Sequence, residues 1–247
     1  STGRNTVGMD TPSATPHADG GREWPGGWHV AVVGETGSTN ADLLRAAAQG
    51  AADRTVLAAR HQTSGRGRLD RRWEAPPGAN LLVSLLFREL PESPHVLTQR
   101  VGLAAITACE RVAGVRPVLK WPNDLLLDGA KLAGILAQAN LGAQPAVVVG
   151  IGLNVGWAPA GSSRLGDGID PLDVLAAMLQ AYDDLPADVW WQYRDHLGTL
   201  GSRVRVELPD GTVEGRALDV EPDGRLNVVD ECGITHRLAV GDVVHLR

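Results

Sequence analysis

A glycine- and arginine-rich stretch is the part of the chain best suited to bind an anion. Residues 62–73 read QTSGRGRLDRRW, with four arginines set around Gly65 and Gly67: Arg66, Arg68, Arg71 and Arg72. Glycine lets a backbone approach a ligand closely, and guanidinium groups present paired donors that match phosphate or carboxylate oxygens. Trp73 adds a flat apolar face on which a purine could stack. An isolated GRGR string is more often a solvated basic turn, so other residues must support an anion site.

The distribution of lysine is the second chemical signal. The 23 basic residues include only two lysines, Lys120 and Lys131, and both fall within one short stretch. A compact ammonium can sit on a single phosphate oxygen, whereas guanidinium is a planar fork. Lys120 lies at the end of an apolar strand, where an unpaired charge is costly, so it needs an anionic partner. That partner is either Asp124 or a ligand.

Three polar residues in a row mark a possible binding site for a small polar ring. Ser38, Thr39 and Asn40 stand where a predicted strand turns into a helix. Capping that helix accounts for one of them. The other side chains, together with the free N–H groups at the helix start, could bind ligand carbonyl and N–H groups. Both interpretations stay open on these residues alone.

The elements that must position these residues follow from the apolar patterns. Strands are predicted at 29–36, 55–62, 80–87 and 118–121, and in a hairpin of 124–127 with 131–138. Residues 146–157 are predicted as an apolar strand that runs into a glycine-punctuated turn, with Asn154 exposed at its end. Helices are predicted at 37–50, 95–113, 171–182 and 187–197. Short Val/Leu runs separated by PDG turns after Gly198 indicate a small antiparallel barrel. We therefore expect a flexible tail at 1–27, a catalytic domain at 28–198 and the barrel at 199–247.

Composition limits the class of protein. The formal net charge of -6 disfavours a general nucleic-acid surface. No apolar run reaches the length of a membrane span and no signal-peptide pattern is present, so a cytoplasmic location is expected. Cys109 and Cys232 lack metal-ligand spacing and are expected to be reduced and without a catalytic role. The dinucleotide-binding fingerprint, the P-loop and nucleophile-triad patterns are all absent.

The motifs together resemble those of the biotin protein ligases, which attach biotin to an acceptor lysine. The resemblance covers the chain from about Trp28 to its end and rests on motifs that recur in the family's order: GSTN (37–40), HQTSGRGR (61–68) continuing to Trp73, KWPND (120–124), KLAGIL (131–136), GIGLNV (150–155) and a closing GDVVHLR. It implies an α+β fold with a mixed-sheet catalytic domain similar to class II aminoacyl-tRNA synthetases, followed by an SH3-like barrel. It also implies ATP, biotin and Mg²⁺, with the metal ligands unknown.

The resemblance assigns roles to individual residues. Lys120, Arg66 and Arg68 would be catalytic, with Lys120 at the α-phosphate. Biotin would contact these three and also Ser38, Thr39, Asn40, Gln62 and Gly67. The adenylate would contact Lys120 together with Gly65, Arg71, Trp73, Asn123 and Asn154.

The expected reaction forms biotinyl-5′-AMP and then transfers biotin to a lysine of a biotin carboxyl carrier protein. Because residues 1–27 show no helix-turn-helix pattern, we expect a ligase without repressor activity, without nucleic-acid or membrane partners, and monomeric or weakly dimeric. A lipoate ligase is the nearest alternative, although the polar trio with Gln62 suits a ureido ring better than a dithiolane. A non-enzymatic biotin or nucleotide sensor is the second alternative, and a nucleic-acid-binding role for GRGR is the third.

Overall fold

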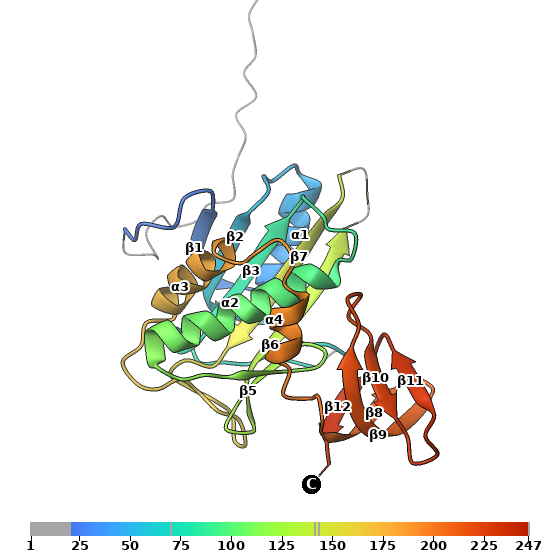
Figure 1. Ribbon diagram of the computed structural model, residues 1–247. Coiled ribbons are helices and arrows are strands. Elements are labelled where there is room, and N and C mark those ends of the chain that lie inside the picture. Colours follow the sequence, from blue (N-terminus) through green and yellow to red (C-terminus); the bar gives the residue numbers. More distant parts are fainter. Residues whose placement is uncertain (1–20, 70, 141, 143, 247) are drawn as a thin grey trace, which may run out of the picture.

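The computed structural model describes residues 21–69, 71–140, 142 and 144–246 (Figure 1). Most of the predicted N-terminal tail lies outside these residues. The described chain forms a large sheet covered by helices and a smaller C-terminal sheet beside it. The large sheet has the strand order β1-β2-β3-β7-β6-β5-β4. Its strands are β1 (His29–Thr36), β2 (Thr55–Gln62), β3 (Leu81–Phe87), β4 (Val118–Lys120), β5 (Asp124–Leu127), β6 (Ala130–Asn140) and β7 (Ala146–Leu153).

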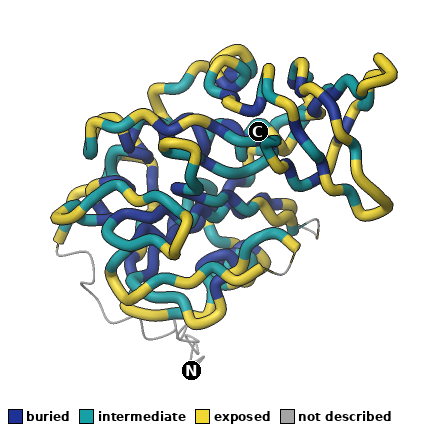
Figure 2. The backbone as a smooth tube through the Cα atoms, turned by 90° about the horizontal axis from the view of Figure 1, so that it is seen from below, coloured by how far each residue is buried: buried dark blue, intermediate teal, exposed yellow. Residues whose placement is uncertain are grey.

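The large sheet is mixed, as predicted. Strands β1 and β2 run parallel, and the other neighbouring strands pair in antiparallel fashion. Strand β3 is buried at every position because helices cover both faces of the sheet. That double covering explains why its sequence, LLVSLLF, is an apolar run that does not alternate. Figure 2 shows the buried residues in the interior of the molecule and the exposed ones mainly along its outer segments.

Helices pack on the two faces of the large sheet. Helix α1 (Thr39–Ala48) contributes Leu43 and Ala47 to a small core on one face, together with Leu86 of β3 and Val148 of β7. Helices α2 (His95–Ala113) and α3 (Pro171–Asp183) pack against each other on the opposite face and bury the main core. The last helix, α4 (Trp190–Asp195), is shorter than predicted.

The C-terminal strands form one antiparallel sheet in the order β11-β10-β9-β8-β12. They are β8 (Arg203–Leu208), β9 (Gly211–Val220), β10 (Leu226–Val229), β11 (Thr235–Leu238) and β12 (Asp242–His245). The predicted barrel is not closed, because β11 and β12 lie at opposite edges and do not pair within the described residues. Only residues 239–241 connect these edges, so the sheet must curl strongly to bring them together.

The C-terminal sheet is attached to the domain of the large sheet by specific polar contacts. The indole of Trp121 donates to the carbonyl of Gly224 at 2.9 Å, and that of Trp190 donates to the carbonyl of Val220 at 3.1 Å. Arg194 of α4 pairs with Asp219 of β9 at 2.7 Å. The second sheet is therefore held against the part of the molecule that contains β4 and α4.

Both cysteines are free thiols. Cys109 is fully buried in α2, and this burial raises the pKa of its thiol to about 12. A thiol that stays protonated is a poor nucleophile. In the described part of the chain, no helix is both long and apolar enough to cross a membrane.

Candidate active site

A cavity lies on the α1 side of the large sheet, and glycines form part of its floor. Gly150 pairs with Ser84 and with Leu136, and in the next row of the same face Gly152 pairs with Leu82 and with Gly134. Because side chains alternate along a strand, these glycines leave the sheet surface bare where bulky residues would otherwise stand. The cavity lining includes these glycines and the arginine-rich loop above them, so a ligand can lie between the two.

The indole of Trp73 packs directly on Gly134 and Gly152. A Cβ atom added at Gly152 would lie 2.4 Å from Trp73 Cε2, and one added at Gly134 would lie 3.2 Å from Trp73 Cζ3. Strand residues other than glycine would therefore push the indole away. The indole Nε1 of Trp73 is buried without a hydrogen-bond partner among the described residues. A donor held at the cavity wall in this way is available to a ligand acceptor.

The loop that carries the arginines is a tight hairpin. The backbone N–H of Trp73 donates to the carbonyl of Gly65 at 3.0 Å, and the N–H of Gly67 donates to the carbonyl of Arg71 at 2.7 Å. Gly65 is buried, and a Cβ there would approach the Trp73 carbonyl to 2.4 Å. Gly65 therefore closes the hairpin and does not itself line the cavity, whereas Gly67 does.

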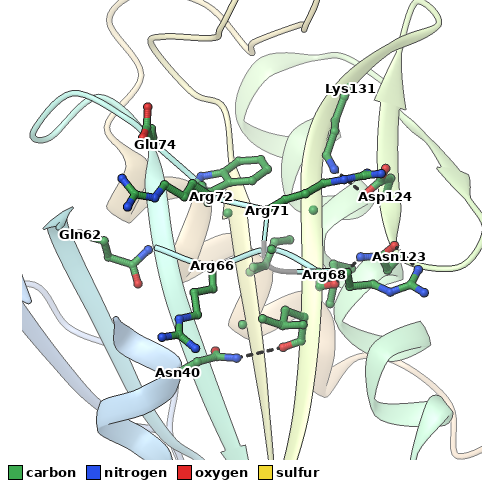
Figure 3. Close-up of a pocket in the computed structure, with 18 of the residues that line it drawn as sticks. Asn40, Gln62, Arg66, Arg68, Arg71, Arg72, Glu74, Asn123, Asp124 and Lys131 are labelled. Carbon is green, nitrogen blue, oxygen red and sulfur yellow. Dashed lines mark hydrogen bonds and ion pairs between the residues drawn. The ribbon is translucent and has the colours of Figure 1, made fainter. Parts of the chain in front are cut away.

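The arginines of this hairpin have different environments. The Arg68 guanidinium donates to Asn123 Oδ1 at 3.2 Å and to the carbonyl of Gly241 at 3.1 Å. Arg71 forms an ion pair with Asp242 at 2.6 Å. Arg66 extends toward Asn40 and has no carboxylate partner within the described residues (Figure 3). Its positive charge is consequently available to an anion bound in the cavity.

Lys131, and not Lys120, is the lysine of the cavity lining. Its Nζ lies 2.8 Å from Asp124 Oδ1 and 5.7 Å from the centroid of the Trp73 ring. Asp124, which sequence reasoning considered as a partner for Lys120, is thus the partner of Lys131. Leu119 enters the core, and the next residue of β4, Lys120, points to the other side, near His245 of β12. The structure does not bring Lys120 to the predicted anion site.

The predicted polar residues do converge on the cavity. Ser38, Thr39, Asn40 and Gln62 line it together with Asn123 and Asn154. Ser38 also caps α1, since its Oγ accepts from the N–H of Ala41. Asn154 was predicted to be exposed, but it is only 2% exposed: its Nδ2 donates to the carbonyl of Ser163 at 3.0 Å and its Oδ1 accepts from Asn80 at 3.2 Å. Asn154 is therefore already engaged in holding the loops around the cavity.

Comparison with known proteins shows which family the chain belongs to. A sequence model of the biotin/lipoate A/B protein ligase family matches residues 35–155, and one of the biotin protein ligase C terminal domain matches residues 199–246. The chain is 42% identical to the biotin–acetyl-CoA-carboxylase ligase of Mycobacterium tuberculosis over 90% of this chain and 91% of that protein. The chain belongs to the biotin protein ligase family.

Two further relatives agree with this membership. The bifunctional ligase/repressor BirA of Bacillus subtilis is 30% identical over 84% of this chain and 71% of its own length. The biotin protein ligase of Aquifex aeolicus in complex with biotin and ATP has a TM-score of 0.74 and 25% identity, covering 89% of this chain and 99% of that one. The fold class predicted for a biotin protein ligase is therefore confirmed.

Several cavity residues of this biotin protein ligase family member received no role from the sequence. Gly134, Gly150 and Gly152 lie inside the motifs KLAGIL and GIGLNV, and Asp242 lies inside GDVVHLR. The signal was present, because glycines at alternate positions of a strand indicate a close approach to its face. Ser84 carried no such signal, since a single serine in an apolar strand does not reveal its neighbours.

Metal ligands are sparse in this part of the ligase. Across residues 21–246, leaving out the gaps at 70, 141 and 143, no three His, Cys, Asp or Glu side chains group as a metal site. Of the carboxylates that line the cavity, Asp124 pairs with Lys131 and Asp242 pairs with Arg71. Glu74 is the cavity carboxylate without an ion pair in the described residues. Such a site fits a metal that arrives already bound to phosphate.

Proposed function

We propose that this chain is an ATP-dependent biotin–protein ligase, which converts biotin to biotinyl-5′-AMP and then transfers biotin to a lysine of a biotin carboxyl carrier domain. The observation that carries the proposal is the meeting of three features in one cavity. They are a polar amide and hydroxyl cluster, a row of bare glycines, and fixed cations supplied by Arg66, Arg68 and Lys131. The family relatives that are named as biotin ligases support the substrate.

In the first step the biotin carboxylate attacks the α-phosphorus of ATP, and pyrophosphate leaves. Two anions have to meet, so their repulsion must be offset by positive charge that is already in place. Arg66 has no competing carboxylate in the described residues, and Arg68 is oriented by Asn123. They are suited to hold the carboxylate and the α-phosphate within reach of each other.

Lys131 takes the role at the phosphate that the sequence suggested for Lys120. Asp124 holds the ammonium at 2.8 Å, and the Lys131 side chain is 38% exposed, so it can still meet a ligand oxygen. In the second step the acceptor amine attacks the carbonyl of the mixed anhydride, and AMP leaves. The same ammonium then stabilises the charge on the departing phosphate. No side chain of the enzyme has to act as a nucleophile.

The hairpin and Trp73 protect the intermediate. A mixed anhydride hydrolyses readily, so water must be kept from it between the two steps. The hairpin lies over the glycine floor, and the indole of Trp73 closes one side of the space. Glu74 is the cavity carboxylate that would help to hold the Mg²⁺ of the nucleotide. When bound, this ion would neutralise phosphate charge.

The test separates the proposal from the two alternatives raised by the sequence. Purified chain is incubated with ATP, Mg²⁺ and labelled pyrophosphate, with and without biotin, and then with a carrier domain. We expect label exchange into ATP that depends on biotin, followed by biotinylation of one lysine. Exchange that depends on lipoate and not on biotin would identify a lipoate ligase. Binding of biotin without any exchange would identify a sensor.

A further inference from the structure

A buried polar cluster lies directly behind the cavity wall, and Ser84 is at its centre. Ser84 is fully buried on β3 and does not itself line the cavity. Its Oγ lies 2.7 Å from Thr39 Oγ1 and 2.5 Å from Asn40 Oδ1. Thr39 Oγ1 lies in turn 3.1 Å from Gln62 Oε1. Thr39 and Gln62 both reach the cavity, so this chain of contacts connects a hidden hydroxyl to the ligand site.

Main-chain groups fix the orientation of both amides in this cluster. The Asn40 amide contacts the carbonyl of Leu136 at 3.1 Å, and a carbonyl can only accept, so the atom facing it must be Nδ2. Its Oδ1 therefore faces Ser84. The Gln62 amide contacts the backbone N–H of Thr39 at 2.8 Å, and an N–H can only donate. The atom of Gln62 that faces it must be Oε1.

These fixed ends determine where the hydroxyl hydrogens lie. Asn40 Oδ1 is only an acceptor and is 2.5 Å from Ser84 Oγ, so the hydroxyl hydrogen of Ser84 must lie between them. Ser84 then has no hydrogen left for Thr39, and the hydrogen in the 2.7 Å contact comes from Thr39. The single hydroxyl hydrogen of Thr39 is thereby committed to Ser84. It is not available to Gln62 Oε1 or to a ligand.

We propose that Ser84 and Asn40 are positioning residues that force the Thr39 hydroxyl to act only as an acceptor toward the cavity. A hydrogen bond from Thr39 Oγ1 to Gln62 Oε1 at 3.1 Å would need the same hydrogen that the 2.7 Å contact with Ser84 requires. With that hydrogen committed to Ser84, the Thr39 and Gln62 oxygens present two acceptors. Such a pair binds a ligand N–H well and rejects a ligand acceptor. The inference deepens the proposed function, because the ureido ring of biotin carries N–H groups and a dithiolane has none.

Asn40 thereby receives a role different from the direct biotin contact that was predicted for it. Its Nδ2 donates to Leu136 and to Gln138 Oε1 at 2.9 Å, and its Oδ1 accepts from Ser84. The side chain lies against Gly150, where a Cβ atom would come within 2.1 Å of Asn40 Oδ1. Gly150 is thus required for Asn40 to reach Ser84.

The test compares biotin with an analogue in which a ureido N–H is replaced by a ring oxygen, a cyclic carbamate of nearly the same shape. Calorimetric titration of the full chain should show about 100-fold weaker binding of the carbamate, since Thr39 Oγ1 and Gln62 Oε1 offer its ring oxygen only acceptors. In Ser84→Ala the Thr39 hydroxyl is free to donate. Biotin binding should weaken about tenfold and the preference for biotin over the carbamate should fall to about tenfold or less.

Cys109→Ala is the matched control, because it removes one buried atom from the opposite face of the sheet. It should leave the preference unchanged even if it lowers the melting temperature as much as Ser84→Ala does. A second variant, Asn40→Ala, removes the oxygen that accepts from Ser84. Ser84 can then donate to Thr39, and the Thr39 hydrogen becomes available to the cavity. The preference for biotin over the carbamate should therefore also fall in this variant. Both variants keeping the wild-type preference would overturn the proposal. Failure of the wild-type chain to bind biotin would instead contradict the proposed function.

Discussion

Lys131 lines the cavity, and its neighbours explain why an ammonium suits that position. Gly134 leaves no side chain beside it: a Cβ there would lie 3.3 Å from Lys131 Nζ. The ammonium fits between Asp124 and the face of Trp73, where a wider guanidinium would need more room. The chain therefore uses one of its two lysines at the place where a compact cation is required.

Replacement of Lys131 by alanine should slow biotin-dependent pyrophosphate exchange by about 100-fold, because one charge-stabilising group is lost from the transition state. Lys120→Ala is the control and should stay within about twofold of the wild type, since Lys120 lies outside the cavity lining. The exchange rate at saturating biotin and ATP is the measurement. A large loss in Lys120→Ala together with a normal rate in Lys131→Ala would return the role to Lys120.

The sequence predicted several residues that line the cavity, but it did not predict which side chains contact one another there. Arg66, Arg68, Thr39 and Gln62 were predicted for the site and do line the cavity. The sequence did not show which lysine would line the cavity, because this depends on strand alternation and on the register shift between Leu125 and Leu126 in the β5–β6 pair. Neither can be read from a hairpin motif. Ser84 was missed because its partners come from α1, which is distant in the sequence.

At the scale of elements, β6 and β7 form a sheet surface on which the hairpin rests. Gly134 and Gly152 face each other across these strands, and Trp73 fills the shallow space above them. Glycine weakens a strand, so two facing glycines in a sheet centre cost stability unless something else packs there. The indole provides that packing. Because Trp73 closes the hairpin that carries the arginines, the position of the arginines depends on Gly134 and Gly152.

Gly152→Ala should displace Trp73, because the new Cβ would lie 2.4 Å from the ring. We expect the free energy of unfolding to fall by about 1–3 kcal/mol, as is usual for overpacking, and the KM for ATP to rise. Denaturant unfolding and steady-state kinetics measure the two effects. Gly34→Ala on β1 is the control, because a Cβ at Gly34 meets nothing within 4 Å. Equal stability of the two variants would show that Trp73 is not held by the glycine floor.

Most helices and strands could be predicted, but their order in the sheets could not. The apolar patterns and the Asp128-Gly129 turn were sufficient for β2, β3, α2 and the β5–β6 hairpin. The placement of β7 between β3 and β6 depends on pairings between distant segments, which local patterns do not encode. The strands of the C-terminal sheet were predicted, but whether its edge strands β11 and β12 pair is a property of the whole sheet and could not be predicted from them.

At the scale of the molecule, the C-terminal sheet holds the hairpin of the catalytic domain. The carbonyl of Gly241, just before β12, accepts from Arg68, and Asp242, the first residue of β12, pairs with Arg71. Arg71 is 62% exposed, so its ion pair with Asp242 is a surface interaction of modest strength. The hairpin is therefore fastened at its tip by the second domain and at its base by Trp73.

Asp242→Ala should loosen the hairpin without unfolding the chain. We expect trypsin to cleave after Arg71 or Arg72 about two to five times faster than in the wild type, as the loss of a surface ion pair allows. Asp210→Ala, on a turn of the same sheet with no ion pair in the described residues, should leave the cleavage rate unchanged. Digestion followed by mass spectrometry measures the rate. Equal rates in both variants would mean that the C-terminal sheet does not restrain the hairpin.

His245 makes the junction between the domains sensitive to acid. Burial, and secondly the positive charge of Lys120, lower the pKa of His245 below its usual 6.5, while its Nε2 lies 3.4 Å from Thr199 Oγ1. Between the pKa of His245 in the folded chain and about 6.5, the unfolded chain binds a proton that the folded chain does not, so stability falls as the pH decreases through this window.

His245→Gln should reduce the slope of the unfolding free energy against pH in this window. Lys120→Met should reduce the slope by less, because Lys120 is the smaller cause of the lowered pKa. The exposed His29→Gln is the control in urea titrations from pH 7.5 to about 5. The same slope in His245→Gln as in the wild type would show that another group at the junction titrates.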